Sequence, residues 1–403
     1  MVGKDSRTAM TGPRSIELHH VLVPLRKPIR HASFERSTSD NLVVRVTLAD
    51  GTTGYGEGLP RPYVTGETIE STFASLSSLD LPRLLGEPAD LAALVRRLET
   101  FELPECQADP RGMAGNSARC ALELALLDAY ARREGRSLGD ALTMAESARD
   151  LLHPTPRRVR YSGAITAETP RKEFLSAFKM WIYGFAQVKV KVGVPGQDDP
   201  ARLGRIRRVI GGRMDLRIDA NEAWSAAEVV DRVAPLRQFR PTALEQPVPH
   251  AEVDALAGLR REIGVPIMLD ESLCGYPDAV RAVERGTADV LNVRLSKCGG
   301  ILPSLRIMAL ARREGLDVQL GCHPGETGIL SAAGRQVACR VRAIRYLEGS
   351  YDRHVLAANL IAEDVTFHYG GRARPLRGPG LGVTVVPEAL DRMTVDRREV
   401  RYD

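Results

Sequence analysis

Short apolar segments alternate with longer amphipathic stretches along the second half of the chain. The segments expected to be strands are VRYSGAI, QVKVKVG, DLRIDAN, ALEQP, PIMLDES, DVLNVRLSK, LDVQLG and AIRYLEG, which lie between residues 159 and 349. The stretches between them have the length and the apolar spacing of helices. Eight strands with intervening helices predict an α/β protein built on a (β/α) barrel. A doubly wound open sheet is the alternative that this pattern leaves open.

The first part of the chain has a different pattern, in which strands come before helices. IELHHVLVPL, NLVVRVTLADG and TTGYGEG are expected as strands, with a turn at Asp50-Gly51. Residues 116–133, NSARCALELALLDAYARR, have apolar positions at helical spacing. After Tyr351 the alternation stops. We therefore predict an α+β domain over residues 1–135, a barrel over 136–352, and a C-terminal segment over 353–403 that packs back on the first domain.

The composition is that of a globular protein without a surface for nucleic acid or membrane. The net charge is +5, but arginines are scattered among acids and only 5% of the residues are aromatic, which argues against a nucleic-acid surface. No stretch has the apolar length of a signal peptide or a membrane span, and the six cysteines show no CxxC spacing. These features predict a cytoplasmic protein without disulfides, and a homo-oligomer is expected, as for most soluble enzymes.

Carboxylates stand at the ends of three adjacent predicted barrel strands, where the catalytic groups of such barrels lie. Asp219, Glu245 and Asp270 are therefore expected to converge on one side of the barrel mouth. Three anions so close need a cation among them, and an all-oxygen ligand set suits Mg²⁺, with Mn²⁺ as the alternative, better than zinc. Each acid alone could instead cap a helix or pair with an arginine, but the three together favour a metal site.

Lysines are expected on both sides of this metal site. In QVKVKVG the period of two places Lys189 and Lys191 on one face, and a barrel strand has no solvated face to receive them. Lys297 ends the sixth strand, four strands away, and so lies opposite Lys191. The charge of Lys189 is expected to lower the pKa of Lys191. An exposed amphipathic strand and a solvated Lys297 are the alternatives.

This arrangement suits removal of a weakly acidic proton next to a carboxylate. A divalent ion on the substrate carboxylate stabilises the enediolate that proton loss creates, and a lysine on each face can remove or return the proton. The expected reactions are racemisation, epimerisation or cycloisomerisation of a small carboxylate, with elimination as an alternative. A lyase that uses one lysine as a Schiff base and a non-catalytic binding protein are the hypotheses from other classes.

The motifs resemble those of the enolase superfamily, in its muconate lactonizing enzyme subgroup. GYGEG and ELALLDAYAR are similar to the family's capping domain, and KVKVG, DANEAW, EQP, LDES and RLSKCGG follow in the family's order along the barrel. The resemblance implies a modified TIM barrel, (β/α)7β, with an N-terminal α+β capping domain completed by the C-terminal segment. It also implies that capping loops, here residues 24–36 and 59–66, select the substrate, and that o-succinylbenzoate synthase-like or acid dehydratase activity is an alternative.

The resemblance also assigns roles to the charged residues at the strand ends. It implies that Asp219, Glu245 and Asp270 are the Mg²⁺ ligands. It also implies that Lys191 and Lys297 are the acid/base catalysts and that Lys189 supports them.

Two stretches depart from the family pattern. Dipeptide epimerases of the family carry Asp-x-Asp after the eighth strand to hold the substrate's amino group, whereas this chain has Ser350-Tyr351-Asp352. After the seventh strand, GCHPGETG has an apparent extra residue, which is expected to direct His323 into the pocket. A buried, hydrogen-bonded imidazole and a capping acid are the alternatives for His323 and Asp352. The candidate substrate-binding residues are Tyr63, Asn221, His323, Glu326 and Asp352.

Overall fold

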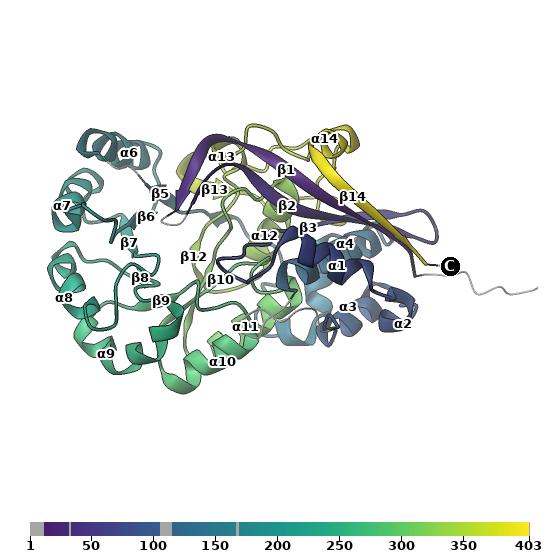
Figure 1. Cartoon of the computed structure of the whole chain (residues 1–403), viewed down its shortest axis with the longest axis horizontal. Helices are drawn as coiled ribbons and strands as arrows, with labels where there is room; N and C mark the ends of the chain where they lie inside the picture. The colour runs from purple at the N-terminus through teal and green to yellow at the C-terminus, as the bar shows by residue number, and fades with distance from the viewer. Residues whose placement is uncertain (1–11, 32–33, 105–114, 167–168, 403) are drawn as a thin grey trace, which may run out of the picture.

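The computed structural model describes residues 12–31, 34–104, 115–166 and 169–402 of the 403-residue chain. It contains a parallel eight-stranded sheet wrapped by helices, and an antiparallel four-stranded sheet that lies beside it with its own helices (Figure 1).

The parallel sheet confirms the predicted (β/α)7β barrel. Neighbouring strands follow chain order: β5 (Gly163–Ile165), β6 (Gln187–Lys191), β7 (Asp215–Asp219), β8 (Leu244–Glu245), β9 (Ile267–Leu269), β10 (Val290–Val293), β11 (Asp317–Leu320) and β12 (Ile344–Leu347). The two outermost strands lie close together. The backbone N–H of Ser162, just before β5, donates to the carbonyl of Leu347, the last residue of β12, at 2.7 Å. The sheet is therefore curled almost into a closed ring, which brings all the strand ends to one mouth.

Seven helical connections cover the outside of this sheet (Figure 1). They are α6 (Pro170–Ile182), α7 (Asp199–Ile210), α8 (Val229–Val233) with η3 (Ala234–Phe239), η4 (His250–Ala255) with α9 (Leu256–Ile263), α10 (Tyr276–Arg285), α11 (Ile301–Arg313) and α12 (Gly328–Arg340). In β6, Val188 and Val190 are fully buried against this layer. The period of two therefore leaves Lys189 and Lys191 facing the barrel interior.

The capping domain is built on the antiparallel sheet β14-β1-β2-β3. Its elements are β1 (Pro13–His31), β2 (Phe34–Leu48), β3 (Thr53–Gly58), α1 (Ile69–Ser77), α2 (Leu81–Leu85), α3 (Leu91–Glu99), α4 (Asn116–Arg133) and β14 (Thr394–Arg401). In Figure 1 the yellow C-terminal strand β14 lies along the purple strand β1, and the two pair from Ser15 with Arg401 to Val21 with Thr394. The end of the chain thus completes the domain that its beginning starts.

Glycines explain how close β3 lies to α4. A Cβ added to Gly54, Gly56 or Gly58 would stand 2.0 to 2.2 Å from backbone atoms of α4, a distance at which atoms clash. The alternating glycines of TGYGEG therefore leave one face of β3 without side chains, and the helix backbone packs directly on it.

Shorter elements link the two domains and the C-terminal segment. They are α5 (Leu138–Ala141), η1 (Leu142–Met144), η2 (Glu146–Ala148), β4 (Val159–Arg160), α13 (Asp352–Val355), η5 (Tyr369–Gly371), β13 (Arg372–Ala373) and α14 (Pro387–Met393). No helix in the described ranges has the length and apolar character to cross a membrane. Five of the six cysteines are free thiols, and Cys106 lies outside the described residues.

Three predicted boundaries differ from the structure. Val159 and Arg160 pair with β13 instead of opening the first barrel strand. The predicted loop over residues 24–36 is largely the end of a long β1–β2 hairpin, with Ile29 opposite Arg36. The sixth barrel strand stops at Val293, so Lys297 lies in the turn beyond it.

Candidate active site

Lys189 stands at the centre of a group of buried carboxylates inside the barrel mouth. Its Nζ lies 3.2 Å from Asp219, 3.3 Å from Glu245 and 3.1 Å from Glu348. Burial by itself would lower the pKa of Lys189, but Glu245, Glu348 and Asp219 outweigh it and raise that pKa well above its ordinary value. The Lys189 ammonium is thus paired with three carboxylates of the mouth.

Asp270 is held by two cations from the turn after β10. Lys297 Nζ donates to its Oδ1 at 2.8 Å and to its backbone carbonyl at 2.6 Å, and Arg294 contacts its Oδ2. Burial would raise the pKa of Asp270, but Arg294 and Lys297 together lower it. Asp270 is therefore ionised at neutral pH in this arrangement.

Glu245 connects these two groups. It is fully buried, it accepts from Asn292 Nδ2 at 2.9 Å, and Arg294 Nη2 lies 3.9 Å from its Oε1. Burial, assisted by the neighbouring acids, raises the pKa of Glu245 to about 8 although Lys189 opposes this. Glu245 lacks enough positive charge around it, which is the condition that a bound cation relieves.

The residues fit a divalent ion once Lys189 gives way. Within the described residues, no three His, Cys, Asp or Glu side chains surround one point as ligands in this conformation. Asp219 and Glu245 nevertheless share one cation, the Lys189 ammonium, and Arg294 lies near both Glu245 and Asp270. The three acids thus form an all-oxygen set, which is the kind of ligand set that a hard metal ion prefers. In this structure an ammonium and a guanidinium group balance the negative charge that such an ion would balance.

The two lysines expected to be catalytic lie at the end of β6 and in the turn after β10, and the three acid-bearing strands stand between these two strands. Lys191 ends β6 and pairs in register with Asp219, while Lys297 follows β10. Lys297 is buried, and its Nζ donates to three oxygens, two of Asp270 and the carbonyl of Asn292. Among the described residues, no hydrogen bond or ion pair involves the Lys191 ammonium.

Three residues of the mouth were not assigned roles from the sequence. Arg294 contacts Asp270, and Glu348 bridges Lys189 and Arg217, whose guanidinium is fully buried over the ring of Tyr346. For Arg294, the spacing along the strand was the sequence signal that could have placed it in the mouth. Arg294 lies two residues after Asn292, so the period of two puts both side chains on the same face.

The candidate substrate-binding residues separate into different places. Asn221 donates to Glu271 at 3.1 Å and has a positive φ of 44°, so it shapes the turn after β7. Tyr63 is 42% exposed on the segment after β3. His323, by contrast, is buried after β11, and its pKa is lowered well below the ordinary value by burial and by Arg294, Arg61 and Lys297.

Glu326 and Asp352 lie at the contact between the barrel and the capping domain. Glu326 Oε1 accepts from the backbone N–H of His323 at 2.6 Å, and burial raises its pKa to about 8. Asp352 begins α13, and burial, with help from Glu57, raises its pKa to about 7 although Ser331 opposes this. Asp352 therefore belongs to a set of buried acids and not to the group around Lys189.

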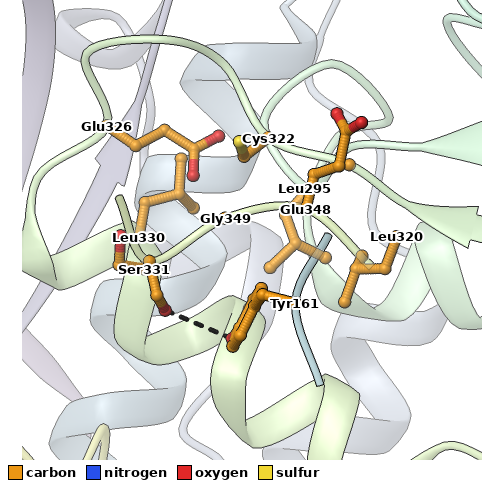
Figure 2. Close-up of a pocket in the computed structure, with 12 residues that line it drawn as sticks. Tyr161, Leu295, Leu320, Cys322, Glu326, Leu330, Ser331, Glu348 and Gly349 are labelled. Atoms are coloured by element: carbon orange, nitrogen blue, oxygen red, sulfur yellow. Dashed lines mark hydrogen bonds between the residues drawn. The ribbon is translucent and has the colours of Figure 1, made fainter. Parts of the chain in front are cut away.

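A small cavity lies among residues at the ends of β11 and β12 and in the first turn of α12 (Figure 2). Tyr161, Leu295 and Leu320 line it together with the acids Glu326 and Glu348. The cavity has room for about one water molecule.

Comparison with known proteins decides the family. A profile of the mandelate racemase / muconate lactonizing enzyme N-terminal domain matches residues 14–142, and an enolase C-terminal domain-like profile matches residues 175–389. The chain belongs to the mandelate racemase/muconate lactonizing enzyme family. It is thus an enzyme of the enolase superfamily, as its motifs indicated.

Relatives of this family member are epimerases, racemases and cycloisomerases. An L-Lys-D/L-Arg epimerase of Methylococcus capsulatus is 33% identical over 89% of this chain and 95% of its own. Muconate cycloisomerase 1 of Rhodococcus opacus is 29% identical over 94% and 98%. Among solved structures, the N-succinyl Arg/Lys racemase of Bacillus cereus superposes with a TM-score of 0.81 at 24% identity, covering 96% of this chain and all of that one, which shows the shared fold.

Proposed function

We propose that the protein is an Mg²⁺-dependent isomerase, with Mn²⁺ as the alternative ion, that moves the α-proton of a small carboxylate substrate. Racemisation, epimerisation and cycloisomerisation are the reactions this covers. The observation that supports it most is the convergence of Asp219, Glu245 and Asp270 on shared cations. The relatives named above and the lysines on strands either side of these acids support the same reaction class.

Asp219, Glu245 and Asp270 would hold the ion. When bound, it supplies positive charge to the substrate carboxylate and makes the α-proton more acidic. Lys189 would leave its place between Asp219 and Glu245 and keep its contact with Glu348, 3.1 Å away. Its charge then lies beside the substrate carboxylate.

Lys191 and Lys297 would exchange the proton on opposite faces of the substrate. Lys297 Nζ is held by three acceptors, the backbone carbonyl and Oδ1 of Asp270 and the carbonyl of Asn292, and we assign it to proton return. Lys191 ends its strand without such acceptors among the described residues, and it is the group we assign to proton removal. Reversing the two roles gives the reaction of the other stereoisomer.

The test is α-proton exchange followed by NMR in D₂O with Mg²⁺, against dipeptide, N-acylamino acid and hydroxy-acid libraries. We expect deuterium at the α-carbon of a substrate and loss of exchange with EDTA. Lys191→Ala and Lys297→Ala should each lower racemisation by at least about 100-fold, the usual contribution of a general acid or base. Lys179→Ala, at an exposed lysine of α6, is the matched control and should keep full activity.

Racemisation that survives both lysine substitutions, or that EDTA leaves undiminished, would contradict the proposal. Borohydride trapping of a carbonyl substrate, without sensitivity to EDTA, would instead identify a Schiff-base lyase.

A further inference from the structure

Arg61 is a buried arginine that has no carboxylate within ion-pair distance in the part of the chain that the structure describes. It lies on the segment after β3 and is 3% exposed. Its guanidinium donates to the carbonyls of Asp40 and Pro60 at 2.7 and 2.9 Å and to Ser39 Oγ at 2.8 Å, all neutral acceptors, while its Nε has no hydrogen-bond partner among the described residues. A buried cation without a counter-ion is unfavourable, so this position favours an anion from outside the chain.

The capping domain places Arg61 against the loop that follows β11. Arg36 Nη2 donates to the carbonyl of Pro324 at 2.9 Å. Ser39 Oγ, which accepts the hydrogen bond from Arg61, packs tightly on Gly325. A Cβ added to Gly325 would stand 2.4 Å from this oxygen. Two arginines from one domain therefore reach the same barrel loop, one directly and one through Ser39.

His323 belongs to this loop and is buried near charged groups of both domains. It is 3% exposed, and neither ring nitrogen has a hydrogen-bond partner among the described residues; the carboxylate of Glu326, 3.9 Å from Nδ1, is too distant. An unsatisfied buried polar group is unfavourable. The charges of Arg294, Arg61 and Lys297 all act on this imidazole.

We propose that Arg61, Arg36 and His323 form a subsite for a second carboxylate, carried by the substrate at the end remote from its α-carbon. This rests on the proposed function, which places the first carboxylate at Asp219, Glu245 and Asp270. The remote carboxylate supplies the counter-ion that Arg61 lacks and accepts a hydrogen bond from the neutral imidazole. The substrate class is thus dianionic, and a cationic tail is repelled.

This assignment separates the chain from its Methylococcus relative, whose name gives a cationic dipeptide. The identity of 33% leaves room for such a change, because a single buried charge at the remote end of the pocket reverses the preferred substrate charge.

The experiment compares adipate with hexanoate, which share a six-carbon chain and differ in the second carboxylate, by calorimetry on the full-length protein with Mg²⁺. We expect adipate to bind at least about tenfold more tightly, as for a charge-assisted pair. Arg61→Gln should bring the ratio of the two affinities close to one, and Arg36→Gln should lower it in part. Arg83→Gln, at an exposed arginine of α2, is the control and should keep the full ratio.

Equal affinities in the unsubstituted protein, or an unchanged ratio in Arg36→Gln and in a folded Arg61→Gln, would overturn the subsite. If Arg61→Gln does not fold, Arg36→Gln and His323→Asn decide the question. A parallel exchange assay with L-Ala-L-Glu, L-Ala-L-Gln and L-Ala-L-Lys separates the two proposals. Selective adipate binding without α-proton exchange of any library member would sustain the subsite and refute the proposed reaction, whereas exchange that prefers L-Ala-L-Lys would refute the subsite alone.

Discussion

Glu57 fastens the capping domain to the barrel through one fully buried carboxylate. It accepts from Asn41 Nδ2 at 2.7 Å, from the N–H and hydroxyl of Thr327 at 2.9 and 2.7 Å, and from the N–H of Leu330 at 2.9 Å. A carboxylate at the first turn of a helix is stabilised by the unpaired N–H groups there. Glu57 therefore fixes the start of α12, and with it the loop that carries His323.

Glu326, beside this contact, makes stability depend on pH. Burial raises its pKa in the folded protein to about 8, from an ordinary value of 4.5. Between pH 4.5 and 8 the folded state therefore holds a proton that the unfolded state has lost. The contribution of this proton to the free energy of unfolding is complete below pH 4.5 and is lost as the pH rises through 8. Glu326→Gln keeps the acceptor but removes the titration, so its melting temperature should fall less between pH 6 and pH 9.

Between pH 6 and pH 8 this titration changes the free energy of unfolding by roughly 2–3 kcal/mol. With an unfolding entropy of about 2.1 cal/mol/K per residue, the expected difference between Glu326→Gln and the unsubstituted protein is about 2–4 °C. Thermal melts by fluorescence at each pH measure it. Glu388→Gln, at an exposed acid of α14, is the control for a lost surface charge. Parallel pH profiles for all three proteins would contradict the assignment.

At the scale of single residues, the sequence predicted which side chains enter the mouth better than it predicted their partners. The period of two along β6 placed Lys189 inside, because Val188 and Val190 occupy the other face. Its partner was expected to be Lys191, two residues away, but the ammonium contacts Glu348, which follows the last barrel strand and is brought near by the closing of the ring. Contacts across a barrel depend on side-chain length and strand stagger, which local periodicity does not encode.

At the scale of elements, strands were predicted as apolar runs, and their ends were the least accurate part. DVLNVRLSK was expected to be one strand up to Lys297, yet β10 ends at Val293 and a turn follows. In that turn Lys297 folds back onto Asp270, a contact that a continued strand could not make. The turn has its own backbone hydrogen bonds, from Cys298 to Arg294 and from Gly300 to Leu295, and ends in two glycines at positive φ.

The pairing of β3 with α4 gives a direct test of close packing. Gly56→Ala would place a methyl group 2.0 Å from the carbonyl of Ala121. The helix must then move away from the sheet, and overpacking of this kind costs about 1–3 kcal/mol.

Chemical denaturation measures this loss. Gly258→Ala is the control because nothing lies within 4 Å of the added Cβ and the position is in helix α9. It should leave stability unchanged or raise it slightly. Equal stability of the two variants would show that α4 does not lie on β3 as described.

At the scale of the whole molecule, the order of the strands in both sheets follows from simple rules. Strands alternating with helices produced a parallel sheet in chain order, as right-handed crossovers require. The antiparallel sheet was harder to predict, because β14 joins β1 from the opposite end of the chain. The sequence indicated that the C-terminal segment returns to the capping domain, but it carried no sign of which edge it would cover.

Removal of residues 394–403 should unfold the capping domain locally. β1 would become an unprotected edge strand over Ser15 to Val21. We expect a lower melting temperature, association of the protein in size-exclusion chromatography, and loss of substrate affinity, because the capping domain carries Arg61. A chain extended by a short glycine-serine tail after Asp403 is the control. A monodisperse truncated protein with unchanged melting would contradict this.

The pairing of β1 with β14 also has a consequence for synthesis on the ribosome. Between His31, the last residue of β1, and Thr394, the first of β14, the chain runs through the whole barrel. At about 5–20 residues per second, this interval lasts roughly 20–70 seconds. For that time the outer edge of β1 has no partner strand, although the residues of the barrel and the rest of the capping domain are already emerging. The nascent chain is therefore exposed to strand-to-strand association until its last residues arrive, and slower growth at lower temperature or a chaperone that covers this edge should raise the yield of folded protein.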